Sequence, residues 1–292
     1  MEFIYHNPKS IQELVTTLNS LENYALLAGG TDLLVKMKEQ LLKPMPQAIV
    51  DINGIDSFKG IAASDGYIII GSLVTHNELT KSSLVRQKAL ALLEAADQVG
   101  SPQIRNVATV GGNICNGSPA ADTVPALIAL DATVEIHSQN GQQEMPLKDI
   151  FTGPGKTCLL PGQFIAKVKV RQIHQNEGAA FLKFGKRKAL AIAIINGAVW
   201  LRLEGNTVSD VKIVLGSVAP TAVRLPAVEQ WLIGKAAEPA VFAQAGARAA
   251  AAIKPIDDVR CNAVHRKHLA SVVVARCLAV AMTRAQERCN CE

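Results

Sequence analysis

Two glycine-rich segments, Leu26-Leu27-Ala28-Gly29-Gly30-Thr31-Asp32-Leu33 and Thr109-Val110-Gly111-Gly112-Asn113-Ile114, lie about 80 residues apart and decide how this chain is interpreted. Each Gly-Gly pair lacks a Cβ at two successive positions and is followed by a small polar side chain, Thr31 or Asn113. Glycine reaches positive φ without steric cost, so backbone N–H groups in such a turn can converge on one anion. Two turns of this kind predict a ligand with two linked phosphates.

Either segment alone is more often a tight connection from a strand into a helix. The sequence also lacks the standard phosphate-binding motifs. It holds no G-x-G-x-x-G, and residues 112–119 have the glycine spacing of a P-loop without the Lys-Ser/Thr that should follow. A Rossmann dinucleotide site and an NTPase are therefore not supported.

Length and composition indicate a globular protein of about two domains, because 292 residues suffice for two separate cores. Hydrophobic residues make up 49% of the chain and charged residues 19%. Aromatic residues make up only 4% and the net charge is +5, so binding of nucleic acid by base stacking is poorly supported. The one dense basic run, residues 183–188, is more typical of a solvated strand end than of a phosphate site.

The six cysteines are scattered and include no C-x-x-C motif. Cys289 and Cys291 supply at most two thiolates near the end of the chain, an incomplete metal site, so we expect no metal. Residues 1–6 lack the basic and apolar regions of a signal peptide, and the apolar stretch 189–201 is too short to span a bilayer. These features favour a soluble protein of the reducing cytoplasm.

The hydrophobic pattern predicts an α+β protein. Residues 25–52 read as a compact β-α-β unit around the first glycine pair, and 83–96 as one helix. Polar residues at 172–178 indicate a domain boundary near residue 175. A run of strands followed by helices after that boundary predicts an antiparallel sheet with helices on one face. The expected strands are 179–184, 192–203 and 208–215, and the helices are 222–232, 236–252 and about 262–282.

These motifs closely resemble the flavin-binding subunit of the bacterial molybdenum hydroxylases, which include xanthine, nicotinate and aerobic carbon monoxide dehydrogenases. The resemblance rests on both glycine segments, on residues 103–114 and on residues 119–127. It extends through residues 151–156 to the final helix at 265–279, and so covers nearly the whole chain. The order and spacing of these motifs are more specific than any one of them. Among the members named, the chain most resembles the FAD-binding subunit of bacterial xanthine dehydrogenase.

The resemblance implies an FAD site of the vanillyl-alcohol-oxidase type, also called the PCMH type. Its FAD-binding domain would span residues 1–175 in two α+β subdomains, about 1–57 and 58–175. A C-terminal α+β domain, residues 176–292, would follow. Residues Leu26 to Leu33 and Thr109 to Asn113 would hold the pyrophosphate between them.

Four more site residues are carried over from the resemblance. Asp122 matches an aspartate that contacts FAD, with a ribose or ribityl hydroxyl as partner. Ile165 matches an apolar contact and Lys183 a cation near the flavin. Val99 stands where relatives often place an aromatic ring over the isoalloxazine. From the residues alone, Asp122 reads as the N-cap of a helix at 123–130, Lys183 as a solvated strand charge, and Ile165 and Val99 as core residues.

The function implied is electron transfer. Electrons from a molybdopterin centre on a large partner subunit would pass through [2Fe–2S] clusters on a small partner subunit to FAD on this chain. They would then reach NAD+ or another acceptor, in a heterotrimer that oxidises a purine such as xanthine. The sequence has no cysteine spacing for an iron–sulfur cluster and no constellation that requires a catalytic side chain.

Two alternatives stay open. A self-sufficient FAD oxidase of the same fold would usually carry a larger substrate domain and often a His or Cys bonded to the flavin, and neither glycine segment offers a His. A protein without FAD that merely joins subunits is the second.

Overall fold

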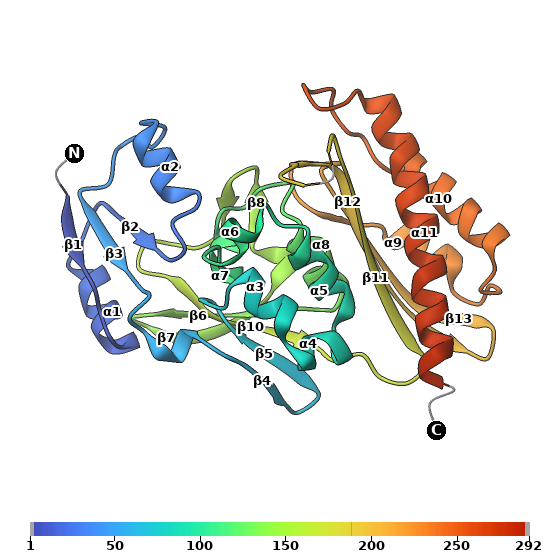
Figure 1. Ribbon diagram of the computed structural model, residues 1–292, viewed down its shortest axis with the longest axis horizontal. Coiled ribbons are helices and arrows are strands. Elements are labelled where there is room, and N and C mark those ends of the chain that lie inside the picture. The colour runs from blue at the N-terminus through green and yellow to red at the C-terminus, as the bar shows by residue number, and fades with distance from the viewer. Residues whose placement is uncertain (1–2, 188, 290–292) are drawn as a thin grey trace.

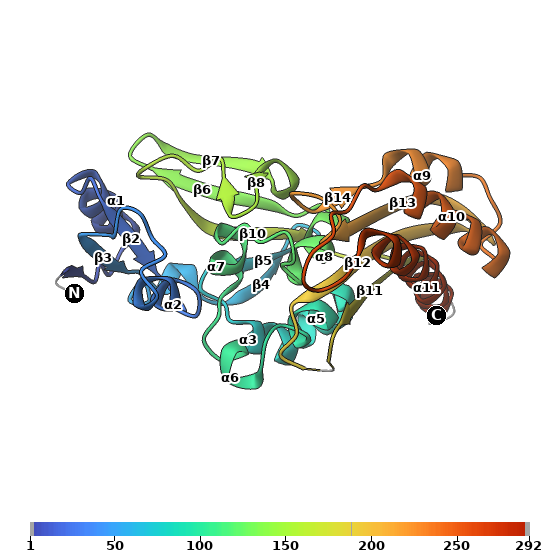
Figure 2. The same ribbon diagram turned by 90° about the horizontal axis from the view of Figure 1, so that it is seen from above.

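Three main β-sheets follow one another along the long axis of the molecule (Figure 1), and the view from above shows the same order (Figure 2). The computed structural model describes residues 3–187 and 189–289, so Cys291 of the cysteine pair lies outside the described residues. We refer to the N-terminal part (residues 3–58), the middle part (59–171) and the C-terminal part (177–289). The predicted α+β class is confirmed.

The N-terminal part is a parallel sheet with strand order β1-β3-β2. The predicted β-α-β unit is confirmed as β2-α2-β3, and the first glycine segment connects β2 to α2. Leu14 and Leu18 of α1 are buried in the core beneath the sheet. The bounds are β1 (Ile4–His6), α1 (Ile11–Asn19), β2 (Tyr24–Leu27), α2 (Leu33–Lys38), β3 (Ala48–Asp51) and η1 (Asp56–Phe58).

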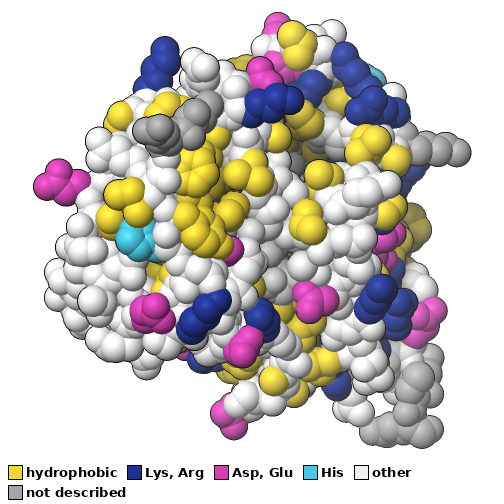
Figure 3. Space-filling model, turned by 60° about the vertical axis from the view of Figure 1, so that its left-hand side comes forward, with side chains coloured by type: hydrophobic (Ala, Val, Ile, Leu, Met, Phe, Trp, Pro, Cys, Tyr) yellow, Lys and Arg dark blue, Asp and Glu magenta, His cyan; other side chains and the backbone are white. Residues whose placement is uncertain are grey.

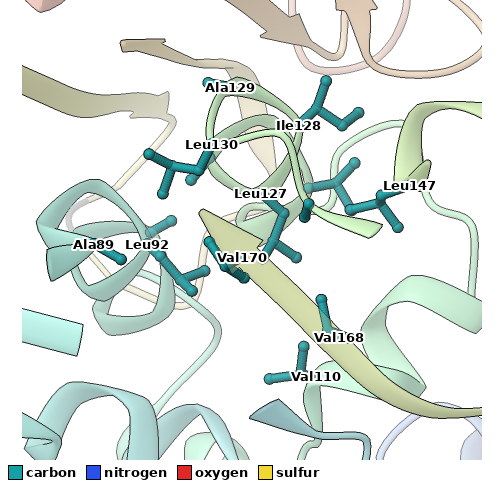
Figure 4. Packing of buried hydrophobic residues seen from close by; sticks show 14 of the residues in the cluster. Ala89, Leu92, Val110, Leu127, Ile128, Ala129, Leu130, Leu147, Val168 and Val170 are labelled. Atoms are coloured by element: carbon teal, nitrogen blue, oxygen red, sulfur yellow. The ribbon is translucent and has the colours of Figure 1, made fainter. Parts of the chain in front are cut away.

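The middle part is an antiparallel sheet with strand order β4-β5-β10-β6-β7. Figure 4 shows Val168 and Val170 of β10 packed with Leu92 and Leu127 in its core. The strands are β4 (Ile61–Ser64), β5 (Tyr67–Gly71), β6 (Thr133–Ser138), β7 (Gly141–Pro146) and β10 (Phe164–Arg171), with a small ribbon of β8 (Phe151–Gly153) and β9 (Lys156–Thr157). The helices are α3 (His76–Lys81), α4 (Ser83–Lys88), α5 (Leu90–Asp97), α6 (Pro102–Arg105), α7 (Val110–Cys115), α8 (Thr123–Ala129) and η2 (Leu147–Asp149).

The single helix predicted at residues 83–96 is wrong, because the chain breaks into α4 and α5 at Ala89. Ala89 has φ −152° and ψ 47°, outside the helical region. The break leaves the Lys88 carbonyl free to accept a hydrogen bond from the Ile173 N–H at 2.9 Å. Ala89 itself is fully buried, so tertiary packing overrides a favourable local helix propensity here.

The C-terminal part is an antiparallel sheet of order β11-β12-β13-β14, and the predicted strands followed by helices are confirmed. Its last helix is longer than expected and continues to Cys289. The bounds are β11 (Glu177–Gly185), β12 (Ala193–Glu204), β13 (Thr207–Gly216), β14 (Val223–Arg224), α9 (Pro226–Leu232), α10 (Pro239–Ala252) and α11 (Ala263–Cys289).

Both faces of this last sheet are buried. Val199 and Leu201 of β12 belong to the core beneath α10 and α11, whereas Ala198 and Trp200 belong to the core of the middle part. Helices α5 and α8 contact the sheet from the middle part, opposite α11 (Figure 1). A strand covered on both faces needs apolar residues at successive positions, which explains the continuous apolar run in β12.

Helix α11 is long and apolar enough to cross a membrane by length and composition alone. It contacts β11, β12 and α10, and its buried residues include Val273, Val274 and Leu278. This contact accounts for much of its apolar character as part of a protein core.

Gly178 tests the contact between β11 and α11. A Cβ at this position would lie 1.8 Å from the Ala281 carbonyl oxygen, so the backbones must separate to admit it. We expect Gly178→Ala to lower the free energy of unfolding by about 2–3 kcal/mol, as overpacking does. Urea unfolding measures the change, and Gly153→Ala is the control because nothing lies within 4 Å of a Cβ there. Equal stability of both variants would contradict the close contact.

Candidate functional site

A cavity of about 330 Å³ lies between the two glycine segments. It is bounded by the N-terminal part on one side and by α7 and the loop before it on the other. Eleven of the predicted site residues line it: Leu26, Ala28, Gly29, Gly30, Thr31, Asp32, Leu33, Val99, Thr109, Gly112 and Asn113.

A backbone contact brings the two segments together. A Cβ on Gly29 would lie 1.9 Å from the Val107 carbonyl oxygen and 3.0 Å from Ala108 Cα, so only glycine fits. The loop before α7 is fixed in turn to the start of α3, because the His76 N–H donates to the Ala108 carbonyl at 3.1 Å. Thr75 and Thr109 form an isolated β-bridge beside this bond. The first Gly of the first segment therefore serves packing between segments.

The first segment presents backbone donors to the cavity. Gly30 has φ +69°, a conformation that L side chains rarely adopt. Within the described residues, the N–H groups of Gly29, Gly30 and Thr31 donate to no protein acceptor. Successive backbone N–H groups that no protein acceptor uses can donate together to one anion, so this turn has the chemistry of an anion site.

The second segment forms the first turn of α7. The Thr109 hydroxyl accepts a hydrogen bond from the Gly112 N–H at 3.1 Å and so caps the helix. A Cβ on Gly112 would meet only that hydroxyl, at 2.9 Å, before entering open space. Thr123 donates to Asn113 Oδ1 at 2.7 Å, which orients the Asn113 side chain and leaves its NH2 group as a donor.

Four predicted residues are not among those that line this cavity. The Leu27 carbonyl accepts from the Ile52 N–H at 3.0 Å, and Val110 is fully buried. The Gly111 N–H donates to the Ser72 carbonyl at 2.9 Å, and a Cβ on Gly111 would collide with that residue. Ile165 is buried in the core of the middle part.

Asp122 and Lys183 form a buried ion pair between the middle and C-terminal parts. Their side chains are 9% and 7% exposed, and Lys183 Nζ donates to Asp122 Oδ2 at 2.6 Å. The Asn196 amide donates to Asp122 Oδ1 at 2.9 Å. Burial raises the pKa of the Asp122 carboxyl, and the Lys183 cation and Asn196 oppose that rise. Asp122 also precedes α8, but its side chain makes no capping hydrogen bond there.

Lys183 also lines a second cavity of about 330 Å³, formed by the loop between β11 and β12. Gln98 lines this second cavity and Val99, the next residue, lines the first. The Gln98 carbonyl accepts from Lys183 Nζ at 3.0 Å. Successive residues of one short stretch of chain thus line the two cavities.

Several cavity residues were missed by sequence reasoning. Lys36 contacts both sides of the cavity, since its Nζ lies 2.6 Å from Asp32 Oδ2 and donates to Asn116 Oδ1 at 3.0 Å. Its spacing of four residues from Asp32 was the available signal for a shared helix face. The others carried no such signal: Leu42, His76, Ile104, Ala108, Cys115, Asn116 and Gly155.

His76 is the most unusual of these residues. Its side chain is fully buried, and both ring nitrogens lack a hydrogen-bond partner among the described residues. Burial, with a smaller contribution from the Arg105 cation, lowers the pKa of His76 to about 4. The imidazole is therefore neutral near pH 7, with one donor and one acceptor.

The pH dependence of stability tests this neutral imidazole. Between the ordinary pKa of 6.5 and the folded pKa of about 4, the unfolded chain binds more protons than the folded chain. Lowering the pH through that window should destabilise the FAD-free protein, by at most about 1.4 kcal/mol per pH unit from this one group. Urea unfolding should show a shallower dependence for His76→Leu, with exposed His268→Leu as the control. An equal slope for wild type and His76→Leu would contradict the assignment.

Comparisons with known proteins bear on this site. Residues 1–171 match the family described as the FAD binding domain in molybdopterin dehydrogenase, and residues 180–281 match the CO dehydrogenase flavoprotein C-terminal domain. The carbon monoxide dehydrogenase medium chain of Hydrogenophaga pseudoflava is 35% identical over 97% of this chain and 98% of its own length. The xanthine dehydrogenase FAD-binding subunit of Escherichia coli O157:H7 is 35% identical over 77% of each.

The fold agrees with these matches. A solved structure of carbon monoxide dehydrogenase from Hydrogenophaga pseudoflava superposes with a TM-score of 0.93, at 34% identity, over 97% of this chain and 98% of that chain. The predicted fold, with an FAD-binding domain followed by a C-terminal domain, is confirmed. The chain belongs to the family of FAD-binding medium subunits of the molybdenum hydroxylases.

Proposed function

We propose that this chain is the electron-transfer subunit of a molybdenum-dependent hydroxylase or dehydrogenase. It would receive electrons from [2Fe–2S] clusters on a small partner subunit, supplied by a molybdopterin-binding large subunit, and deliver them to NAD+ or another acceptor. The observation that carries the proposal is the cavity between two glycine segments, with a turn of unpartnered N–H groups on one side.

The residues of the cavity fit the pyrophosphate of FAD. The N–H groups of Gly29 to Thr31 would donate to phosphate oxygens, and the Lys36 ammonium supplies a cation beside them. On the opposite side, the missing Cβ of Gly112 leaves room where a phosphate must approach the backbone. The Asn113 NH2 group adds a side-chain donor.

The second cavity is the proposed place for part of the flavin half. Ligand cavities are commonly about 300–1,000 Å³, so the first cavity alone is small for a dinucleotide. Lys183 would present its cation to this region, held by Asp122 and the Gln98 carbonyl. Asp122 already accepts hydrogen bonds at both carboxylate oxygens, so we propose that it mainly positions Lys183. Val99 and Ile165 remain proposed apolar contacts.

Bound FAD supplies the redox chemistry, because it accepts electrons singly and releases them as a pair. The protein's contribution is binding, orientation and a fixed positive charge. This division requires no nucleophile, and we propose no catalytic side chain.

An assembly with partner subunits is supported by apolar surface. Leu34, Val35 and Leu41 of the N-terminal part are each more than half exposed. Figure 3, which brings that side of the molecule forward, shows apolar side chains gathered on it among charges of both signs. Clustered exposed apolar groups mark interaction sites. We propose a heterotrimer in the cytoplasm.

The proposed domain division lies near residue 175. Strand β10 ends at Arg171 and β11 begins at Glu177, whose buried carboxylate accepts hydrogen bonds from Arg171 and Arg202. The second cavity is formed mostly by residues after this division, which implies that the C-terminal domain closes one wall of the flavin site.

The substrate of the whole complex is proposed to be a purine such as xanthine. Carbon monoxide is the second candidate, because the match to the carbon monoxide dehydrogenase medium chain covers more of this chain at equal identity. The substrate would bind on the large partner subunit in either case.

Gly112→Ala tests the FAD site. The new methyl group would occupy space beside the phosphates and displace the Thr109 cap, at a cost of about 1 kcal/mol in stability. We expect the purified variant to lose most of its flavin while it stays folded. Ser10→Ala is the control, because Ser10 caps α1 in the same way and lies outside the cavity. Full flavin content in Gly112→Ala, measured by absorbance after denaturation, would contradict the site.

The electron-transfer role predicts that the isolated chain cannot oxidise a substrate by itself. Water-derived hydroxylation needs a metal centre, and no cluster of metal-ligating side chains occurs among residues 3–187 and 189–289. FAD-loaded protein should therefore show at most NADH–dye reductase activity, and no xanthine or carbon monoxide oxidation. Turnover of either substrate with partner subunits shown to be absent would favour the self-sufficient oxidase. Purification without any flavin uptake would favour the FAD-free joining subunit.

A further inference from the structure

The backbone of His76 is held in place beside the cavity. It is the first residue of α3, and its N–H is bonded to the Ala108 carbonyl directly before the second glycine segment. The preceding Thr75 caps α3 in a reciprocal capping box with Glu78, which fixes the backbone entering the helix. These contacts fix the backbone from which the imidazole extends.

The unpartnered state of the imidazole carries a cost in the FAD-free protein. Leaving a buried donor or acceptor unsatisfied costs free energy. Neither ring nitrogen has a hydrogen-bond partner in the described part of the chain, yet the residue lines a cavity. A ligand group bound in the cavity could supply the missing partner.

The position of His76 indicates which half of bound FAD would lie beside it. Helix α3, which begins with His76, contacts α6, and Arg105 of α6 donates to the Val99 carbonyl at 3.2 Å, so His76 lies toward the Val99 end of the cavity. Lys36, Asp32 and the unpartnered turn serve the phosphate end. The neutral ring can donate one hydrogen bond and accept another, which suits an uncharged hydroxyl or ring-edge group.

We propose that His76 is a positioning residue that hydrogen-bonds an uncharged group of the flavin half of FAD, a ribityl hydroxyl or the ring edge. The proposal rests on the proposed function, because it requires FAD in this cavity. It assigns a role to a residue that lies outside both glycine segments in the sequence and that nothing in its local sequence distinguishes.

Binding of FAD and of ADP to the full chain, after removal of its flavin, separates the two halves of the cofactor. His76→Leu removes both ring nitrogens at similar size, and should weaken FAD binding about tenfold, as expected for one hydrogen bond. ADP binding should be unchanged, because ADP lacks the flavin half. His76→Asn keeps a polar group near the ring position and should recover part of the loss. His137→Leu is the control for a histidine outside the cavity.

A structural role for His76 would give a different pattern. If His76 is a positioning residue, as proposed, His76→Leu should leave the FAD-free protein at least as stable as wild type, since it removes an unsatisfied polar group. Unchanged FAD affinity in His76→Leu would overturn the proposal, as would equal weakening of FAD and ADP. Wild-type protein that takes up neither ligand would overturn the proposed function itself, a distinct result.

Nitrogen NMR of histidine-labelled wild-type protein gives a readout that needs no substitution at His76. FAD should shift one buried imidazole resonance in the direction of hydrogen bonding, and ADP should leave it in place. No shift with FAD bound would overturn the proposal.

Discussion

The contact of Gly29 with the Val107 carbonyl is the constraint on which the site depends. The two backbones approach so closely that a Cβ on Gly29 would lie 1.9 Å from the oxygen. This contact joins the parallel β-α-β unit to the loop before α7 in the middle part. The turn after Gly29 is then held open toward α7, and the space between them becomes the cavity. Glycines that look alike in the two Gly-Gly pairs therefore have different roles. Gly29 and Gly111 pack against backbone, whereas Gly112 leaves open space.

Charged groups at the boundary between the middle and C-terminal parts set their relative position. Arg284 of α11 pairs with Glu94 of α5, and Lys183 pairs with Asp122. Buried ion pairs add little net stability, because desolvation offsets the attraction, but a buried charge left without its partner is strongly destabilising. Such pairs therefore disfavour alternative arrangements of the two parts. A fixed arrangement of the two parts matters at Lys183, because the C-terminal sheet supplies a wall of the second cavity there.

Local patterns predicted the longer helices and strands better than they predicted helix breaks and short edge strands. The β-α-β unit and the strand-then-helix order after residue 177 followed from periodicity, which is set by residues close in sequence. The break at Ala89 did not, since it is stabilised by a bond from Ile173, far along the chain. The edge strands β1 and β7 were also missed, because short, largely exposed strands carry little apolar alternation.

The sequence by itself determined the family, the two glycine-rich turns and the α+β order, because each is encoded in contiguous residues with strong steric or periodic requirements. It also placed most of the residues that line the first cavity. Only the tertiary structure decided which glycines face the cavity, that Lys36 reaches both sides of it, and that Asp122 and Lys183 contact each other. It also decided that His76 lies buried beside the second segment, with no hydrogen-bond partner for its ring among the residues that the structure describes. These features depend on residues brought together from distant positions in the sequence. Whether a polar side chain has a hydrogen-bond partner is decided by those residues.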